Sequence, residues 1–211
     1  MGVIQEFFLE LRDRLINRKN ADSRHVFTDV SNEPFSGAGT VLSMSIKNAD
    51  MLTSRMQPHE LIQFLSEEQN QVVNLIKKWQ GVIIYQVAGE VLAYWRDIES
   101  ASAPVDAKSA FSAALSILKT YSPLLNVRIV LADGSIFGDT FGPQQQFQIR
   151  GTAVTLAEKL MMIPNENFSN RQHVILISEK IVPLLNIDES DMRVIRHMQD
   201  GMNIFELVRY E

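Results

Sequence analysis

Residues 80–95 read QGVIIYQVAGEVLAYW, and this stretch decides the fold of the chain. Its two apolar runs, residues 82–87 and 91–95, are rich in β-branched and aromatic side chains, which favour strands. The segment Ala88-Gly89-Glu90 between the runs is typical of a tight turn, because glycine adopts backbone conformations that other residues avoid. We therefore predict a β-hairpin in the middle of the chain.

Helices and strands are predicted on both sides of this hairpin. Before it, apolar residues recur at helical spacing from Pro58, a favoured first-turn residue, to the glycine at 81, and residues 40–46 form a short apolar strand. After it come a helix over residues 105–121 and two strands, 127–131 and 135–141, joined by a turn at Asp133-Gly134. This order of elements predicts a ferredoxin-like βαββαβ core, an α/β (α+β) fold.

The two ends of the chain extend this core. The last third is predicted to add a helix over residues 152–162, a strand over 173–178, a short helix over 179–185, and a hairpin of residues 192–198 and 204–210. At the other end, residues 1–19 are predicted to form an amphipathic helix with the apolar residues Ile4, Phe7, Phe8, Leu11, Leu15 and Ile16. Residues 20–38 are polar and are interpreted as a linker, which leaves residues 39–211 as one domain.

Composition excludes several classes of function. The net charge of -5 argues against a nucleic-acid-binding surface, which needs a basic excess. The absence of cysteine rules out disulfides, thiolate metal sites and a cysteine nucleophile, and it fits a reducing compartment. Charged residues interrupt the N-terminal segment, and no apolar run approaches the roughly 18 residues that a membrane span requires. We therefore expect a cytoplasmic protein.

The N-terminal helix has a second interpretation, as a helix on a membrane surface. Its basic residues Arg12, Arg14, Arg18 and Lys19 favour that interpretation. Glu6, Glu10 and Asp13 oppose it, because they would be repelled by anionic lipid. We expect the helix to pack on the domain or on a sister helix instead.

Four segments resemble motifs of the class III nucleotide cyclase catalytic domains, and they occur in the order of that family. Residues 41–50, VLSMSIKNAD, are similar to the family's Val-Leu-Phe-x-Asp-Ile-x-Gly-Phe-Thr, and residues 80–95 resemble its Lys-x-x-Gly-Asp hairpin. Residues 151–160, GTAVTLAEKL, are similar to Gly-Asp-x-Val-Asn-x-Ala-x-Arg-Leu, and residues 174–178 match a family strand that ends on serine. The resemblance implies a core of the class III cyclase type with an extra C-terminal helix and hairpin.

The resemblance also implies where the metal ligands would lie. In the family two aspartates hold two Mg²⁺ ions. The first falls on Ser45, whose neutral hydroxyl cannot replace a bridging carboxylate. The second falls on Gly89, or on Glu90 if one residue is deleted from the strand; turn composition favours Glu90 as a solvated turn residue. No cofactor is expected, and Mg²⁺ or Mn²⁺ would bind only if the site has been rebuilt.

The nucleotide-binding positions implied by the resemblance are changed as well. In the glycine-rich corner that approaches the phosphates, Asn48 replaces glycine and Asp50 replaces threonine. A carboxylate at Asp50 would oppose polyphosphate binding, and it could also cap the following turn. The base-reading lysine falls on Tyr85, or on Gln86 if the deletion is accepted.

The groups that orient the ribose and stabilise the transition state fall on Thr155 and Lys159, and lysine lacks the planar fork of arginine. Because both sets of catalytic groups are lost, we predict a non-catalytic regulatory module that forms a homodimer or binds a protein partner in signalling. The alternative is an active cyclase, rebuilt around Glu90, Asp97 and Lys159, that makes a cyclic nucleotide from ATP or GTP. A third hypothesis is a receptor domain in which Tyr85 stacks on a different small ligand.

Overall fold

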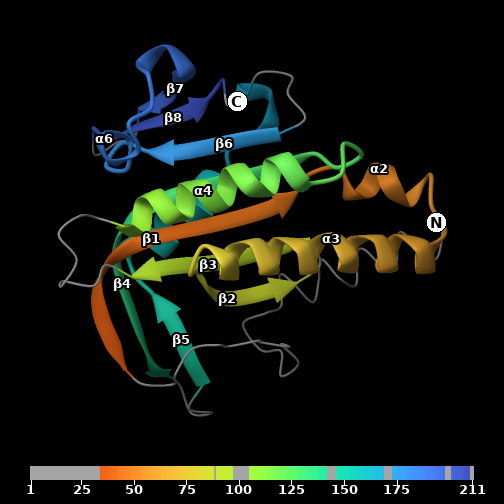
Figure 1. Cartoon of the computed structure of the whole chain (residues 1–211), viewed down its shortest axis with the longest axis horizontal. Helices are drawn as coiled ribbons and strands as arrows, with labels where there is room; N and C mark the ends of the chain where they lie inside the picture. Colours follow the sequence, from red (N-terminus) through yellow and green to blue (C-terminus); the bar gives the residue numbers. More distant parts are fainter. Residues whose placement is uncertain are drawn as a thin grey trace.

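The computed structural model describes residues 34–87, 89–96, 105–141, 146–168, 173–197 and 201–209 (Figure 1). The predicted N-terminal helix over residues 1–19 lies outside this part of the chain, and so does the predicted linker up to residue 33. No helix among the described residues is both long enough and apolar enough to cross a membrane.

The core has the predicted ferredoxin-like order. Its elements are β1 (Phe35–Ile46), α3 (Pro58–Lys78), β2 (Val82–Val87), β3 (Glu90–Arg96), α4 (Val105–Thr120) and β4 (Val127–Phe141). The strands lie side by side in the order β2-β3-β1-β4, and each neighbouring pair is antiparallel. Strands β3 and β4 follow one another along the chain but are separated in space by β1, as the split β-α-β arrangement requires.

The C-terminal third widens this sheet. The further strands are β5 (Gln146–Arg150), β6 (His173–Ser178), β7 (Met192–His197) and β8 (Asn203–Leu207). Strand β6 pairs with β4 in parallel, β8 and β7 follow it, and β5 pairs with the end of β4. The remaining elements are α2 (Ala49–Thr53), α5 (Thr152–Met161), α6 (Val182–Leu185), η2 (Asn165–Asn167) and η3 (Glu189–Asp191).

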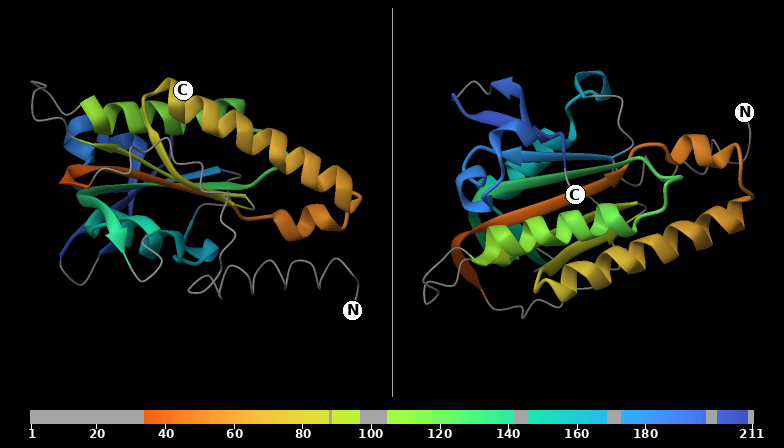
Figure 2. Two further views of the ribbon diagram at one scale, coloured as in Figure 1. Left: turned by 90° about the horizontal axis from the view of Figure 1, so that it is seen from below. Right: turned by 45° about the horizontal axis from the view of Figure 1, so that its top comes forward.

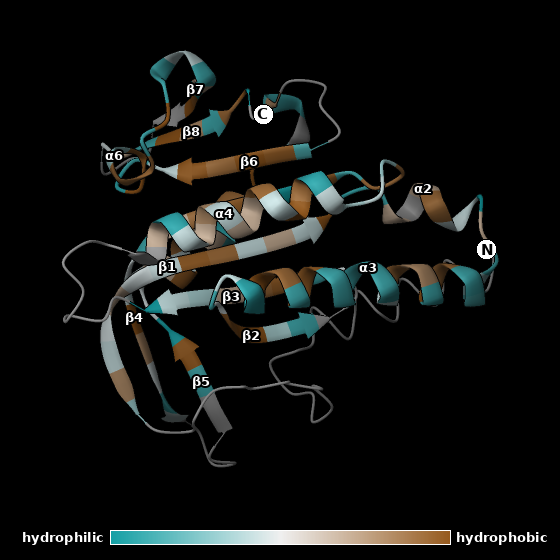
Figure 3. Ribbon diagram, in the orientation of Figure 1, coloured by the Kyte–Doolittle hydropathy of each residue, from teal (hydrophilic) through white to brown (hydrophobic). Residues whose placement is uncertain are grey.

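Helices cover both faces of the sheet (Figure 2). Helices α3 and α4 lie on one face over an apolar core that includes Leu42 and Met44 of β1. Helix α5 lies on the other face over a second core that includes Val41. Because strand side chains alternate between faces, β1 supplies both cores. Strand β6 also contributes to both cores, and Figure 3 shows that it is hydrophobic for nearly all of its length.

The predicted hairpin at Asp133-Gly134 is wrong. Strand β4 runs without a turn through both residues, and it pairs with β1 from Phe35↔Gly138 to Ile46↔Val127. Gly134 serves a different purpose: a Cβ there would overlap the Oγ1 of Thr152, so glycine lets the start of α5 approach the strand. The turn signal was therefore the signature of close packing between a strand and a helix.

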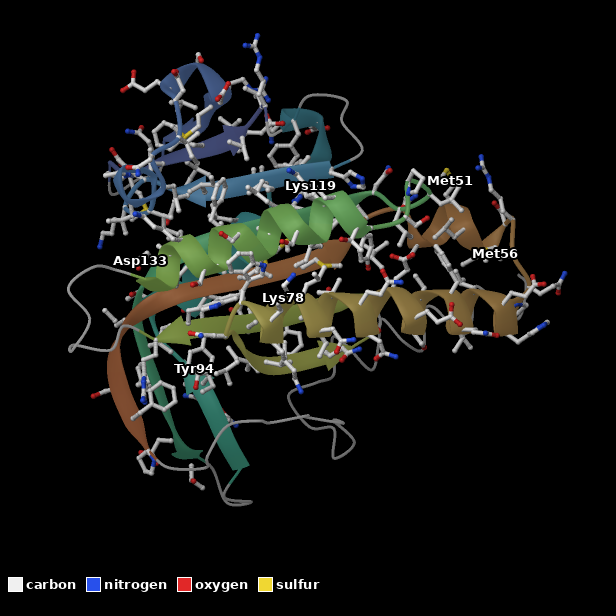
Figure 4. The ribbon with its side chains drawn as sticks, viewed as in Figure 1. Met51, Met56, Lys78, Tyr94, Lys119 and Asp133 are labelled. Carbon is white, nitrogen blue, oxygen red and sulfur yellow. The ribbon has the colours of Figure 1, made fainter. Side chains whose placement is uncertain are left out.

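The other differences from the sequence predictions are smaller. Strand β1 begins at Phe35, inside the predicted linker, and the Phe35 ring stacks on Tyr94 with centroids 5.5 Å apart. The last short helix, α6, spans only four residues, and the short helix α2 after β1 was not predicted. Met51 on α2 lies at the end of the sheet where β1 ends (Figure 4).

Candidate functional site

The position implied for the first metal ligand lies in a row of three polar residues across the sheet. Ser45 of β1 pairs directly with Glu90 of β3 on one side and with Arg128 of β4 on the other. Directly paired residues project their side chains to the same face of a sheet. Ser45 is buried, with 7% of its surface exposed, and it lies between Glu90 and Arg128 on one face of the sheet.

The register decides which residue lies beside Ser45. Glu90 is the first residue of β3 and is half-buried, so the interpretation of Glu90 as a solvated turn residue is wrong. Gly89 occupies the turn with a φ of +88°, and its carbonyl oxygen accepts a hydrogen bond of 3.0 Å from the N–H of Ile46. Of the two positions considered for the second ligand, the structure brings Glu90 to Ser45.

Arg128 is the residue of this row that the sequence analysis missed. Only 2% of its surface is exposed, and its Nη1 donates to the carbonyl oxygens of Met161 at 2.8 Å and Ile163 at 2.6 Å. The guanidinium also lies over the ring of Phe168, 4.5 Å from the centroid. Burial lowers the pKa of Arg128 to about 10. The sequence contains a feature that indicates this role, because an arginine inside the apolar run VRIVL of a core strand is buried and needs hydrogen-bond partners.

Lys47 adds a second positive charge at the end of β1. Desolvation by the surrounding protein lowers the pKa of Lys47, the charge of Arg128 lowers it further, and Glu90 acts in the opposite direction. Together with Lys47, the row offers one carboxylate and two cations, a donor set that does not fit a pair of divalent ions. Among the described residues, no three His, Cys, Asp or Glu side chains are grouped to hold a metal.

Asn48 makes two hydrogen bonds to the backbone at the corner after β1, where the family has its glycine-rich segment. Its Nδ2 donates to the carbonyl oxygen of Leu124 at 2.8 Å, and its Oδ1 accepts from the N–H of Asn126 at 2.7 Å. Lys47 donates its N–H to the carbonyl oxygen of Asn126 at 2.8 Å. The corner after β1 is therefore tied to the loop before β4. The side chain of Asp50 lies outside the described part of the structure.

We expect Asn48→Ala to lower the free energy of unfolding by about 2 kcal/mol, because it leaves two backbone groups of a partly buried loop without their partner. Chemical denaturation of the variant and the parent measures this loss. Asn70→Ala, on an exposed position of α3, is the matched control and should change stability by less than about 0.5 kcal/mol. Equal stability of the Asn48 variant and the control would contradict the assignment.

The remaining candidate residues divide between the faces. Tyr85 pairs with Leu92 and packs against the core beneath α5, on the face of Ser45. Gln86 pairs with Val91, which belongs to the core beneath α3 and α4, so it occupies the opposite face. Thr155 and Lys159 are exposed on α5, four residues apart and on the Ser45 side of the sheet. Asp97 lies outside the described residues.

No protein-family model matches the sequence, and no curated protein sequence is significantly similar to it. Solved structures are similar in fold. Adenylyl cyclase CyaB from P. aeruginosa has a TM-score of 0.65 and 21% identity, covering 85% of this chain and 97% of its own. The dimeric guanylyl cyclase domain of the RhoGC fusion protein from the aquatic fungus Blastocladiella emersonii has a TM-score of 0.63 and 18% identity. The match covers 83% of this chain and 98% of that domain.

A third structure, the guanylyl cyclase Cya2, has a TM-score of 0.61 and 13% identity, covering 84% of this chain and 94% of its own. These structures are matched over almost their whole length, and at such identities the similarity concerns the fold. The chain has the fold of the class III adenylyl and guanylyl cyclase catalytic domains.

Proposed function

We propose that this chain is a non-catalytic regulatory module with the cyclase fold, which forms a homodimer or binds a protein partner in signalling. The observation that carries the proposal is the row at Ser45: it holds one carboxylate, Glu90, where a two-metal site needs two. Phosphoryl transfer without bound metal loses its main electrostatic stabilisation. The proposal includes no resident cofactor and places the protein in the cytoplasm.

The chemistry at the other positions supports the same proposal. Asn48 is committed to two backbone groups of the loop before β4 and is not available to a ligand. Neither Tyr85 nor Gln86 provides a cation for reading a base, and Lys159 carries a single ammonium in place of a planar fork. The changes affect base recognition, phosphate binding and the transition state together, and a partner subunit of the same sequence would supply none of them.

Nucleotide binding by calorimetry tests this proposal. Protein of known oligomeric state is titrated with ATP or GTP in the presence of Mg²⁺ or Mn²⁺. We expect no heat of binding at millimolar nucleotide, because no pair of carboxylates neutralises the metal ions that accompany the triphosphate. Metal-dependent binding at micromolar concentration would contradict the proposal. Sedimentation distinguishes the homodimer from the module that binds a different protein. A monomer at high protein concentration would exclude self-association, and the proposal would then require a different protein as the partner.

One observation favours an alternative, an active cyclase with a rebuilt site. Glu90 lies directly opposite Ser45, where a single carboxylate could still hold Mg²⁺ or Mn²⁺. The solved neighbours are adenylyl and guanylyl cyclases, so ATP or GTP would be the substrate in this alternative. Formation of cyclic nucleotide that is abolished by Glu90→Gln, and retained in Glu67→Gln on the exposed side of α3, would establish it.

A further inference from the structure

A buried carboxylate interrupts the apolar stripe of α3. Glu68 lies between the buried residues Leu61 and Val72 of this helix, and only 8% of its surface is exposed. Burial of a carboxylate costs free energy unless hydrogen-bond donors replace the water that it loses. The N–H of Ser122 donates to Oε2 of Glu68 at 3.3 Å. Because such bonds are most often found at about 2.9–3.0 Å, this one is weak.

The residue before Ser122 has a donor without an acceptor. Tyr121 is buried, with 5% of its surface exposed, and among the described residues its hydroxyl group has no hydrogen-bond partner. Burial raises the pKa of Tyr121, and the nearby charge of Glu68 raises it further, so the hydroxyl keeps its proton. A buried donor without an acceptor is unfavourable. Two neighbouring donors, an N–H and an O–H, therefore lie beside one carboxylate.

These two donors compete for Glu68. In the observed arrangement the carboxylate accepts from Ser122 and leaves the Tyr121 hydroxyl unpaired, so it does not satisfy both donors. An O–H that donates to a carboxylate makes a short and strong hydrogen bond. A second arrangement, in which Glu68 turns to the hydroxyl, would therefore gain a good bond and release the Ser122 N–H. The movement needs only a change of rotamer of the Glu68 side chain.

Ser122 begins a loop that ends at the corner after β1. The N–H of Leu124 donates to Oγ of Ser122 at 3.3 Å. The carbonyl oxygen of Leu124 and the N–H of Asn126 are the two groups that Asn48 binds. This loop leaves α4 at the end of the domain where β1 ends and α2 follows (Figure 1). A displacement of Ser122 is therefore passed through hydrogen bonds to the corner, next to the row at Ser45.

We propose that Glu68 is a two-position latch between α3 and the loop over residues 122–126. In one position it accepts from the Ser122 N–H, and in the other it accepts from the Tyr121 hydroxyl. Release of Ser122 frees the loop to move and to carry Asn48 with it, so α3 and the corner after β1 are coupled in both directions. The inference goes beyond the proposed function, because it concerns this coupling whether or not the domain catalyses a reaction.

Amide hydrogen exchange in the full chain, followed by NMR for single residues, tests the latch. Tyr121→Phe keeps the ring and removes the competing O–H, so the carboxylate is left with the Ser122 N–H. We expect the Ser122 amide to exchange at least about fivefold more slowly than in the parent. Glu68→Gln keeps the shape of the side chain and removes its charge, so the same amide should exchange about fivefold faster.

The amide of Asn126 reports on the coupling, because it donates to Oδ1 of Asn48. We expect its exchange rate to change in the same direction as that of Ser122 in both variants, while the amides of β6 keep the rates of the parent. Unchanged or faster exchange of Ser122 in Tyr121→Phe would overturn the inference. An Asn126 rate that does not follow the Ser122 rate would overturn it too, because the loop would then not carry the movement.

The double variant distinguishes competition from packing. If the two donors compete for the carboxylate, Tyr121→Phe should slow the exchange of Ser122 by less than about twofold once Glu68 is replaced by glutamine. An equally strong slowing in that background would assign the effect to packing and overturn the inference. Glu67→Gln on the exposed side of α3 and Tyr94→Phe on the other face of the sheet are matched controls, which should leave the Ser122 rate unchanged. Because none of these measurements involves nucleotide, their failure leaves the calorimetric test of the proposed function standing.

Discussion

Gly151→Ala is expected to destabilise the domain by about 3 kcal/mol or more, which corresponds to a fall in melting temperature of roughly 6–12 °C for a chain of this size. Gly151 is the N-cap of α5 with a φ of +139°, a conformation that side-chain-bearing residues rarely adopt. A Cβ at this position would also overlap the carbonyl oxygen of Ser135. That oxygen belongs to β4, whose pairing with β1 holds it in place, so neither partner can move cheaply.

Substitutions at two other glycines distinguish the two causes of this loss, which are backbone strain at positive φ and the overlap of a Cβ with a neighbouring atom. Gly201 has a φ of +84°, and nothing lies within 4 Å of the position that a Cβ would occupy, so Gly201→Ala should cost only the backbone strain, about 1–2 kcal/mol. Gly37 has open space and no positive φ, and Gly37→Ala should change stability by less than about 0.5 kcal/mol. Thermal and urea denaturation of the three variants gives the order. A Gly151 variant as stable as the Gly37 variant would refute the close packing of α5 on β4.

The second large effect is expected for Arg128→Leu, which should lower the free energy of unfolding by about 3–4 kcal/mol. Leucine is apolar, so its burial costs little, but the carbonyl oxygens of Met161 and Ile163 lose a charged donor. Arg128→Lys keeps the charge and loses the flat surface over Phe168, so an intermediate loss is expected. Because the hydrogen bonds end at the C-terminus of α5, hydrogen exchange should accelerate over residues 161–168 before it does so in β1.

Lys159→Met is the control for the loss of a positive charge. Lys159 is exposed on the same helix, and its replacement should change the free energy of unfolding by less than about 0.5 kcal/mol. If Arg128→Leu were as stable as this control, Arg128 would not be the anchor between β4 and the end of α5. Urea denaturation of the four proteins, with the parent included, provides the comparison.

The sequence predicted the elements of the core well where the signal is local. The helix from Pro58, the strands 82–87 and 173–178 and the helix from residue 152 agree with α3, β2, β6 and α5. Each of these is specified by the spacing of apolar residues within one segment, which does not depend on distant parts of the chain. The types of residue at the site, such as serine at position 45, were also evident from the sequence.

The two wrong predictions, a turn at Asp133-Gly134 and a solvated turn residue at Glu90, are explained by pairing between strands that are distant in the sequence. Asp133-Gly134 has the composition of a turn, yet pairing with the whole of β1 keeps β4 extended, and the glycine is needed for contact with Thr152. Glu90 has the composition of a turn neighbour, yet the register of β3 on β1 places it opposite Ser45. Neither outcome is encoded within a few residues, because each depends on the pairing of β1 with a strand that lies far from it in the sequence.

The sequence by itself determined the class of fold, the boundaries of most core elements and the absence of a carboxylate at position 45. Only the tertiary structure decided that Ser45, Glu90 and Arg128 form one row, that Asn48 ties two loops together, and that Tyr85 and Gln86 lie on opposite faces. The physical reason is strand register: a shift by one residue moves every side chain to the other face, and register is set by packing across the whole sheet.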